Sequence, residues 1–463
     1  MLSDMKSANS APLLTPLFAG RKMREIFSDA GRIGGMLRFE AALARAEARV
    51  GVIPQAAAAA IESQCRAELF DRDKLGQGAA LAGNPAVPLV TQLAALVERE
   101  DRAAAQFVHF GATSQDAMDT GLVLQLRDAL DAIETDLAAL SEILAAMASA
   151  HTHTLMAGRT WMQQALPITF GLKAAGWLSA IERHRARIAQ MRPRVLVLQL
   201  GGAAGTLAAF GENGLRVAEA LARELRLGVP DIPWHAHRDR LAEVAATAGL
   251  LTGTLGKIAR DVSLLMQTEI GEAFEPQGEG RGGSSTLPQK HNPVGCAATL
   301  SAAIRVPALV SVMLTAMVQE NERGLGNWHA EWDTLPEIFL LTGGAIEQMT
   351  AVLGGLRVDA ARMEENLEVT RGRILAEAVV TALAPAMGRL EAKRLVEQAA
   401  LLASRQNRHL REVLAEDPRL RERFSAAEME RLFQPSGYLG QAGAMIDGVV
   451  KASAPAKSGS GKK

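Results

Sequence analysis

Residues 137–150 read Leu-Ala-Ala-Leu-Ser-Glu-Ile-Leu-Ala-Ala-Met-Ala-Ser-Ala. Alanine and leucine have high helix propensities, and the stretch contains neither glycine nor proline, so it predicts an α-helix. Over residues 250–270 the apolar positions recur at steps of three and four, which places them on one helix face. Similar patterns predict long helices over 117–150, 167–192, 296–320 and 334–353, and no segment shows convincing β alternation.

Several of these helices exceed the usual length of a globular helix, which favours a bundle of parallel rods. We therefore expect an all-α protein whose parts are an N-terminal helical domain over 1–106, a central long-helix bundle over 107–356 and a C-terminal helical domain over 357–450. Within the last domain we expect shorter helices, broken by Pro385, Pro418 and Pro435. Residues 451–463 are of low complexity and are expected to be disordered. Long Ala/Leu faces favour an oligomer over one large monomeric bundle.

The composition argues against several classes of partner. The net charge is −1, and the chain contains one Tyr, five Trp and twelve Phe, so neither a basic surface nor stacking aromatics indicate nucleic acid. Only two cysteines are present, which indicates no disulfide framework and no oxidising compartment. We see no secretion signal and no apolar run long enough to cross a membrane, so we expect a cytoplasmic protein with no membrane partner.

Residues 283–293 read Gly-Ser-Ser-Thr-Leu-Pro-Gln-Lys-His-Asn-Pro, and they carry most of the chemical information. A glycine-rich run precedes two adjacent hydroxyls, so the segment can form a loop that opens and closes. Lys290 supplies a point charge and Asn292 supplies amide donors two residues further on. These groups suit an enzyme that holds a developing carbanion next to a carboxylate.

This segment resembles the signature loop of the fumarase/aspartase superfamily, Gly-Ser-Ser-x-Met-Pro-x-Lys-x-Asn, with Leu287 in place of Met at similar volume. The resemblance implies a three-domain fold with a long central helical bundle, and a homotetramer whose active sites each gather segments from three subunits. It also implies that Lys290 and Asn292 stabilise the carbanion, that Ser284 exchanges the proton at the α-carbon, and that Ser285 contacts the substrate.

A second segment, His109-Phe-Gly-Ala-Thr-Ser-Gln-Asp116, opens a predicted helix. Taken alone, Thr113 and Ser114 are best explained as an ordinary N-cap. The same pattern binds a substrate carboxylate in adenylosuccinate lyases, so the resemblance implies that Thr113 and Ser114 bind substrate. It further suggests that His109 positions a carboxylate or shuttles a proton.

The segment Gly158-Arg-Thr-Trp-Met-Gln-Gln-Ala165 resembles the family's Gly-Arg-Thr-His pattern, but it departs from it. Trp161 stands where the lyases have the histidine that protonates the leaving group, and Gln164 replaces a second histidine. The substitution puts those lyase activities in doubt. Arg159 and Thr160 are retained as candidate substrate contacts, and a structural ion pair is the alternative for Arg159.

Two further segments, Pro233-Trp-His-Ala-His-Arg-Asp239 and Asn327-Trp-His-Ala-Glu-Trp332, are most similar to the cycloisomerase branch of the superfamily. Its members close a lactone by adding a carboxylate of a carboxylated muconate to the substrate's own double bond. A carboxylate with a pKa near ~4 is already ionised at neutral pH, so no acid is needed on the leaving-group side. A tryptophan can then replace the histidine and shape a dry pocket. For a tricarboxylate substrate the candidate cations are Arg159, Arg238 and Arg323.

Other motifs carry no function. Gly278-x-Gly280-x-x-Gly283 lacks the strand that a dinucleotide fingerprint requires, and the two His-x-His pairs have no Cys or carboxylate at metal spacing. We therefore expect neither a metal nor another cofactor.

Two alternatives remain open. The first is an adenylosuccinate-lyase-like enzyme with the acid duty moved to His109 or His329. The second is a non-catalytic helical assembly protein, against which the retention of the serine loop argues.

Overall fold

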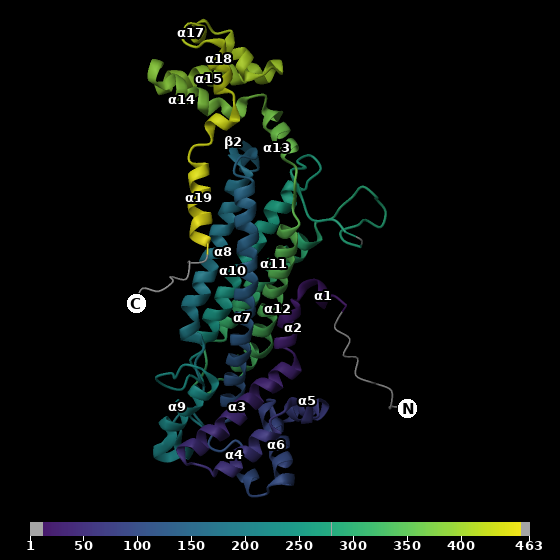
Figure 1. Cartoon of the computed structure of the whole chain (residues 1–463), viewed down its shortest axis with the longest axis vertical. Helices are drawn as coiled ribbons and strands as arrows, with labels where there is room; N and C mark the ends of the chain where they lie inside the picture. The colour runs from purple at the N-terminus through teal and green to yellow at the C-terminus, as the bar shows by residue number, and fades with distance from the viewer. Residues whose placement is uncertain (1–12, 279, 455–463) are drawn as a thin grey trace, which may run out of the picture. The chain divides into compact units, whose positions relative to one another are not determined.

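The computed structural model describes residues 13–278 and 280–454, and helices dominate this part of the chain (Figure 1). The expected all-α class is therefore confirmed. The described residues divide into two compact units. Unit 1 contains the residues up to Leu137 together with His184–Gly256 and Ala298–Gln348, and unit 2 contains Ala138–Arg183, Lys257–Ala297 and the residues from Met349 onward.

Five long helices contribute to both units because each is continuous across a unit boundary: α7 (Ser114–Ala150), α8 (Phe170–Val195), α10 (Asp239–Leu265), α11 (Val294–Thr315) and α12 (Asn327–Gly354). Each of the five long helices predicted from the sequence corresponds to one of these. Their ends differ by several residues, as expected when capping geometry rather than periodicity sets a boundary.

The remaining helical elements of unit 1 are shorter: α1 (Thr15–Phe18), α2 (Arg21–Ile26), α3 (Asp29–Val50), α4 (Gln55–Gln64), η1 (Ala67–Leu69), α5 (Arg72–Ala82), α6 (Ala86–Glu100), η2 (Ala104–Phe107), η3 (Ala208–Asn213) and α9 (Gly214–Leu225). Helix α3 crosses α7 at a pair of glycines. A Cβ added to Gly35 would lie 2.7 Å from the carbonyl oxygen of Gly121, so only glycine permits this approach.

Unit 2 adds the shorter helices α13 (Ala360–Leu367), η4 (Glu368–Thr370), η5 (Arg373–Leu375), α14 (Ala376–Met387), α15 (Arg389–Gln406), α16 (Leu410–Ala415), α17 (Pro418–Arg421), α18 (Ala426–Leu432), η6 (Pro435–Tyr438) and α19 (Ala442–Ser453). Pro385 does not break a helix as expected, because it lies inside the last turn of α14. The disordered tail was predicted to start at residue 451, but α19 continues to Ser453. Residues 455–463 lie outside the described part.

The expectation that the chain contains no β structure was wrong, because unit 2 contains two short pairs of strands. Strand β1 (Leu155–Thr160) pairs antiparallel with β2 (Gln163–Thr169), and a short second pair joins β3 (Ala273–Phe274) to β4 (Arg357–Val358). The first hairpin turns at Trp161 and Met162, whose φ angles are 51° and 65°. Positive φ at both central residues is usually supplied by Asn-Gly, so the sequence lacked the ordinary hairpin signal.

Helix α11 also differs from expectation. It is the one helix in the described residues whose length and apolar composition would suffice to cross a membrane, whereas the sequence suggested none. Arg305 interrupts it and pairs with Glu337 of α12. Ile304 remains 75% exposed, so α11 leaves apolar surface uncovered in the single chain.

Candidate active site

In unit 1 the start of α7 is tied to a neighbouring loop by one buried carboxylate. Asp116 accepts hydrogen bonds from the backbone N–H groups of Thr113 at 3.0 Å, Gly201 at 3.0 Å and Gly202 at 2.9 Å. The Nε2 atom of His235 lies 2.6 Å from the same carboxylate. This network fixes the first turn of α7 against the loop that follows residue 200.

The hydroxyls of Thr113 and Ser114 stay available in this arrangement. Both residues are half-buried, and neither hydroxyl makes a hydrogen bond to the described residues. The first N–H groups of a helix lack intrahelical acceptors and carry a partial positive charge. The start of α7 can therefore bind a carboxylate through hydroxyls and backbone donors together.

Arg323 lies beside this helix start. Its Nε donates to Oε1 of Gln115 at 2.9 Å, and one terminal nitrogen donates to the carbonyl of Ala203 at 3.2 Å. Its other terminal nitrogen has no partner in the described residues, and the side chain is exposed. Arg323 thus retains donors for an anion next to the α7 start.

His109 belongs to the same unit and makes a short contact with a carboxylate from α3. Its Nδ1 lies 2.6 Å from Oε1 of Glu40, which is 1% exposed. Burial alone would lower the pKa of His109, but the charge and hydrogen bond of Glu40, assisted by Asp116, raise the pKa above its usual value. The backbone of His109 takes a φ of 57°, a left-handed conformation that is uncommon for residues other than glycine.

The structure argues against the substrate contact that was expected for Arg238. Its guanidinium is buried and donates to Glu331 through Nε at 3.0 Å and to Asp119 through NH1 at 2.6 Å and NH2 at 3.0 Å. The two remaining N–H bonds reach Glu331 and the carbonyl of His235. With every donor used, Arg238 has none left for a ligand.

The two tryptophan-containing segments surround the three ion-paired residues Arg238, Asp119 and Glu331. The indole of Trp234 lies 5.0 Å from the Arg238 guanidinium, and Nε1 of Trp328 donates to Asp119 at 3.3 Å. Glu331 comes from the second segment. These segments therefore form a buried polar cluster in unit 1, which the sequence resemblance did not reveal.

In unit 2 the serine loop is closed at its base by backbone contacts. The N–H of Asn292 donates to the carbonyl of Gly282 at 2.8 Å, and the Asn292 amide donates to Gly283 at 3.4 Å. The Oγ of Ser284 accepts from the N–H groups of Thr286 at 3.3 Å and Leu287 at 3.0 Å. Two donors aimed at one hydroxyl oxygen favour its alkoxide over the neutral group.

The other two loop candidates face outward in the single chain. Ser285 and Lys290 are exposed, and among the described residues the Ser285 hydroxyl contacts Thr286 alone, at 3.5 Å. Buried Glu275, which precedes the loop, accepts hydrogen bonds from the N–H groups of Gly295 at 3.1 Å and Cys296 at 2.7 Å, which follow the loop at the start of α11. The loop is therefore mounted on a fixed base while its tip is accessible.

Arg159 forms an ion pair in unit 2, as the structural alternative for this residue predicted. Its two terminal nitrogens donate to the two carboxylate oxygens of Glu272 at 2.8 and 2.5 Å, and Glu272 is fully buried. The amide of Gln164, opposite Arg159 in the hairpin, donates to the carbonyl of Asn366 at 2.8 Å. Oε1 of Gln164 is buried without a hydrogen bond from the described residues.

The two remaining candidates of the hairpin, Thr160 and Trp161, are exposed to solvent in the single chain. Trp161 is 96% exposed, and Thr160 at the end of β1 is exposed as well. No hydrogen bond or ion pair within the described residues joins this tip to the serine loop. The candidates therefore fall into three groups: the α7 start with His109 and Arg323, the hairpin, and the serine loop.

Sequence reasoning missed the carboxylates that organise these groups. No local motif contains these carboxylates together with their partners, because Glu40, Glu272 and Glu275 are distant in sequence from the residues that they contact. Asp116 was visible as the end of the His109–Asp116 segment, but its role as a shared acceptor depends on the loop at Gly201.

Comparisons with known proteins identify the family. A family model described as "Lyase" matches residues 19–308, and one described as "Adenylosuccinate lyase C-terminus" matches residues 372–449. The 3-carboxy-cis,cis-muconate cycloisomerase of Pseudomonas aeruginosa is 55% identical over 443 residues, covering 96% of both chains.

Solved structures lead to the same group. The 3-carboxy-cis,cis-muconate lactonizing enzyme from Pseudomonas putida has a TM-score of 0.92 at 52% identity, covering 96% of this chain and 99% of that one. The β-carboxy-cis,cis-muconate cycloisomerase from Acinetobacter calcoaceticus has a TM-score of 0.91 at 46% identity, covering 95% and 100%. The chain therefore belongs to the lyase family of the fumarase/aspartase superfamily, in the group that contains the bacterial 3-carboxy-cis,cis-muconate cycloisomerases.

Proposed function

We propose that this enzyme converts 3-carboxy-cis,cis-muconate to 4-carboxymuconolactone in the catabolism of aromatic compounds. The observation that carries the proposal is the near-full-length identity of 55% to a cycloisomerase. Trp161 supports it, because a tryptophan at the leaving-group position suits a reaction that needs no acid there.

In the proposed reaction a substrate carboxylate attacks the double bond and forms the ring C–O bond. The electron pair moves into the neighbouring carboxylate, and the resulting aci-carboxylate carbanion is then protonated at its α-carbon. Lys290 and Asn292 would stabilise the doubly charged group, which is the main contribution to lowering the barrier. Ser284 would deliver this proton, and in reverse would remove it.

Ser284 is a weak base unless its alkoxide is stabilised. Two backbone N–H groups already donate to its oxygen, at 3.0 and 3.3 Å, and the exposed Lys290 lies on the same loop. Closure of this loop over a substrate would exclude water and strengthen both interactions.

The substrate carries three carboxylates, and the chain offers two kinds of contact for them. The α7 start supplies Thr113, Ser114 and backbone donors, and Arg323 supplies free N–H groups beside it. We keep Arg159 only as an organiser of Gln164 and Thr160, since Glu272 already occupies its guanidinium. His109, whose Nδ1 lies against Glu40, would add its other ring nitrogen as a hydrogen-bond donor.

We further propose a homotetramer whose active sites are completed by different subunits. Members of this superfamily are typically oligomeric. Trp161 at 96% exposure and Val318 at 76% are large apolar side chains that a neighbouring copy would cover. The same reasoning assigns the uncovered face of α11 to contacts between copies and not to a membrane. Both cysteines are free thiols, in keeping with a cytoplasmic location.

An ultraviolet assay of the loss of the 3-carboxymuconate diene tests the reaction. Adenylosuccinate and argininosuccinate should be run in parallel, because the match to the adenylosuccinate lyase C-terminus favours the elimination enzyme as the second candidate. Loss of the diene with no turnover of the succinyl substrates is expected. Turnover of adenylosuccinate alone would replace the cycloisomerase by the lyase.

The shared site has its own test. Ser284→Ala and Thr113→Val should each be inactive, and mixing them after reversible dissociation should restore part of the activity. A chain that sediments as a monomer at micromolar concentration would contradict the assembly without affecting the assigned reaction.

A further inference from the structure

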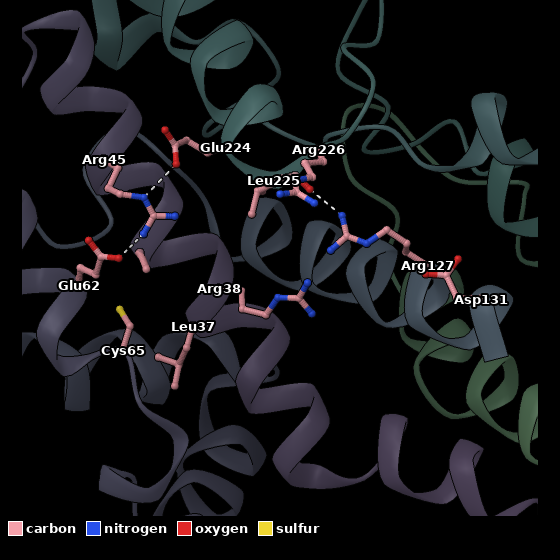
Figure 2. Close-up of a pocket in the computed structure, with 11 residues that line it drawn as sticks. Leu37, Arg38, Arg45, Glu62, Cys65, Arg127, Asp131, Glu224, Leu225 and Arg226 are labelled. Carbon is pink, nitrogen blue, oxygen red and sulfur yellow. Dashed lines mark hydrogen bonds and ion pairs between the residues drawn. The ribbon is translucent and has the colours of Figure 1, made fainter. Parts of the chain in front are cut away.

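Unit 1 contains a pocket of about 650 Å³ that none of the candidate active-site residues lines (Figure 2). Its walls come from α3, α7, the end of α4 and the end of α9. The charged lining residues are four arginines and three carboxylates: Arg38, Arg45, Arg127, Arg226, Glu62, Asp131 and Glu224. The volume of the pocket lies within the range of about 300–1,000 Å³ that is typical of small-molecule sites.

The three carboxylates of the pocket are already neutralised. Glu62 and Glu224 both pair with Arg45, at 2.5 and 3.0 Å, and Glu224 also pairs with Arg49. Asp131 pairs with Arg192, which does not line the pocket. None of the three is therefore left to neutralise the remaining arginines.

Only one carboxylate lies near the remaining three arginines, and it contacts two of them. Arg38 donates to Asp128 at 3.0 Å, and Nε of Arg127 lies 3.7 Å from the same group. Arg226 has no side-chain partner in the described residues. Figure 2 shows the guanidinium groups of Arg38, Arg127 and Arg226 ending in the same part of the pocket. Like charges held together in this way repel one another unless an anion joins them.

Arg127 is held by a backbone contact, and the exposed Arg226 has an uncommon backbone conformation. One terminal nitrogen of Arg127 donates to the carbonyl of Leu225 at 2.6 Å, at the end of α9. Arg226 follows immediately, in the left-handed conformation with φ 55° and ψ 47°. Glycine or asparagine ordinarily occupies this position after a helix, so an arginine here costs backbone energy.

We propose that this pocket binds a small anion carrying two or more carboxylates, at a site separate from the active site. A guanidinium presents a planar fork that matches a carboxylate in bidentate fashion. The cations stand on three different elements, so they suit separate carboxylates on one carbon skeleton better than a single phosphate. Leu37, Ala41 and Leu225 supply the apolar wall for that skeleton.

Isothermal titration of the full-length protein with citrate, at constant ionic strength, tests the site. Arg226→Gly removes the guanidinium while suiting the left-handed backbone, and Arg127→Ala removes the second cation. Each should weaken citrate binding at this site by about tenfold or more, the usual effect of losing a charge-assisted hydrogen bond. The matched control is Arg216→Ala, which removes an exposed α9 arginine whose one hydrogen-bond partner among the described residues is Asn213; this variant should bind citrate like the wild type.

The active site is itself expected to bind carboxylates, so Thr113→Val separates the two. Citrate binding that survives in Thr113→Val and is lost in Arg226→Gly would support the proposal. Binding lost in Thr113→Val and unchanged in Arg226→Gly and Arg127→Ala would overturn it and leave the proposed reaction untouched. Inorganic phosphate should bind more weakly than citrate, and equal or tighter phosphate binding that needs Arg226 would refute the polycarboxylate assignment.

Discussion

Replacing Arg238 by methionine tests whether the guanidinium is a structural element or a substrate ligand. Three buried charged side chains meet there: Arg238 at 2% exposure, Asp119 at 2% and Glu331 at 1%. Removal of one member of a buried ion pair costs about 3–5 kcal/mol, because the remaining charges stay desolvated. Gln115, Trp328 and Gln319 still donate to the two carboxylates, so we expect the lower end, about 3 kcal/mol.

The pH dependence of this loss has a definite sign. Burial raises the pKa of Glu331, which Arg238 pulls in the opposite direction. Without Arg238 the pKa of Glu331 in the folded protein rises further above its unfolded value. A carboxyl group of this kind is most stabilising below its unfolded pKa and loses that contribution as the pH rises through its folded pKa. The stability deficit of Arg238→Met should therefore be smaller at pH 5 than at pH 8.

Chemical denaturation at both pH values, followed by circular dichroism, measures this deficit. Arg419→Met at the surface serves as the control. It should shift the denaturation midpoint little, because exposed ion pairs contribute little to the free energy of unfolding. A triple variant that also carries Asp119→Asn and Glu331→Gln should recover part of the loss. An unchanged midpoint with a raised KM would refute the structural role and return Arg238 to the substrate site.

Three further predictions concern other residues. Ser284→Ala should reduce kcat to less than about a tenth of wild type while substrate affinity and the unfolding midpoint stay nearly unchanged, as expected for a proton-transfer group; diene loss and substrate titration measure this, and higher residual turnover would exclude an essential role. Trp161→His should lower kcat/KM and Trp161→Phe should lower it less; a histidine variant as active as wild type would show that the tryptophan is merely tolerated. Burial and the charge of Glu40 raise the pKa of Glu47 to about 9, so wild-type stability should fall between pH 4.5 and about 9. Glu47→Gln should flatten this decline in denaturation midpoints, and parallel curves for the two proteins would contradict the assignment.

The helical architecture could be predicted because period and propensity act locally. The stretch at 137–150 lies within α7 (Ser114–Ala150), and the apolar stripe from 250 lies largely within α10. The β1–β2 hairpin could not be predicted, since Trp161 and Met162 adopt turn conformations that their residue types disfavour. Both side chains are exposed in the single chain, so neither local sequence preference nor burial within the described residues accounts for the turn.

The site divides in the same way. The serine loop and the α7 start could be found as motifs, because each resembles a family segment with particular residues at fixed spacing. The tertiary partners of each candidate residue could not be predicted from the sequence. Arg238 is attached to Asp119 and Glu331, and Arg159 to Glu272, through contacts between residues about 90 to 120 positions apart. A charged residue in a family-like segment cannot be assigned to substrate or to structure until those partners are known.

On the role proposed for Trp161, stability and turnover place opposite demands on the tip of the β1–β2 hairpin. Left-handed conformations at Trp161 and Met162 cost about 1–2 kcal/mol each for residues other than glycine or asparagine. Laboratory evolution for heat resistance alone should therefore enrich Asn and Gly at these two positions, and it should lose turnover as it does so. Among natural homologues, an Asn-Gly pair at this tip would mark a lineage released from selection on the reaction.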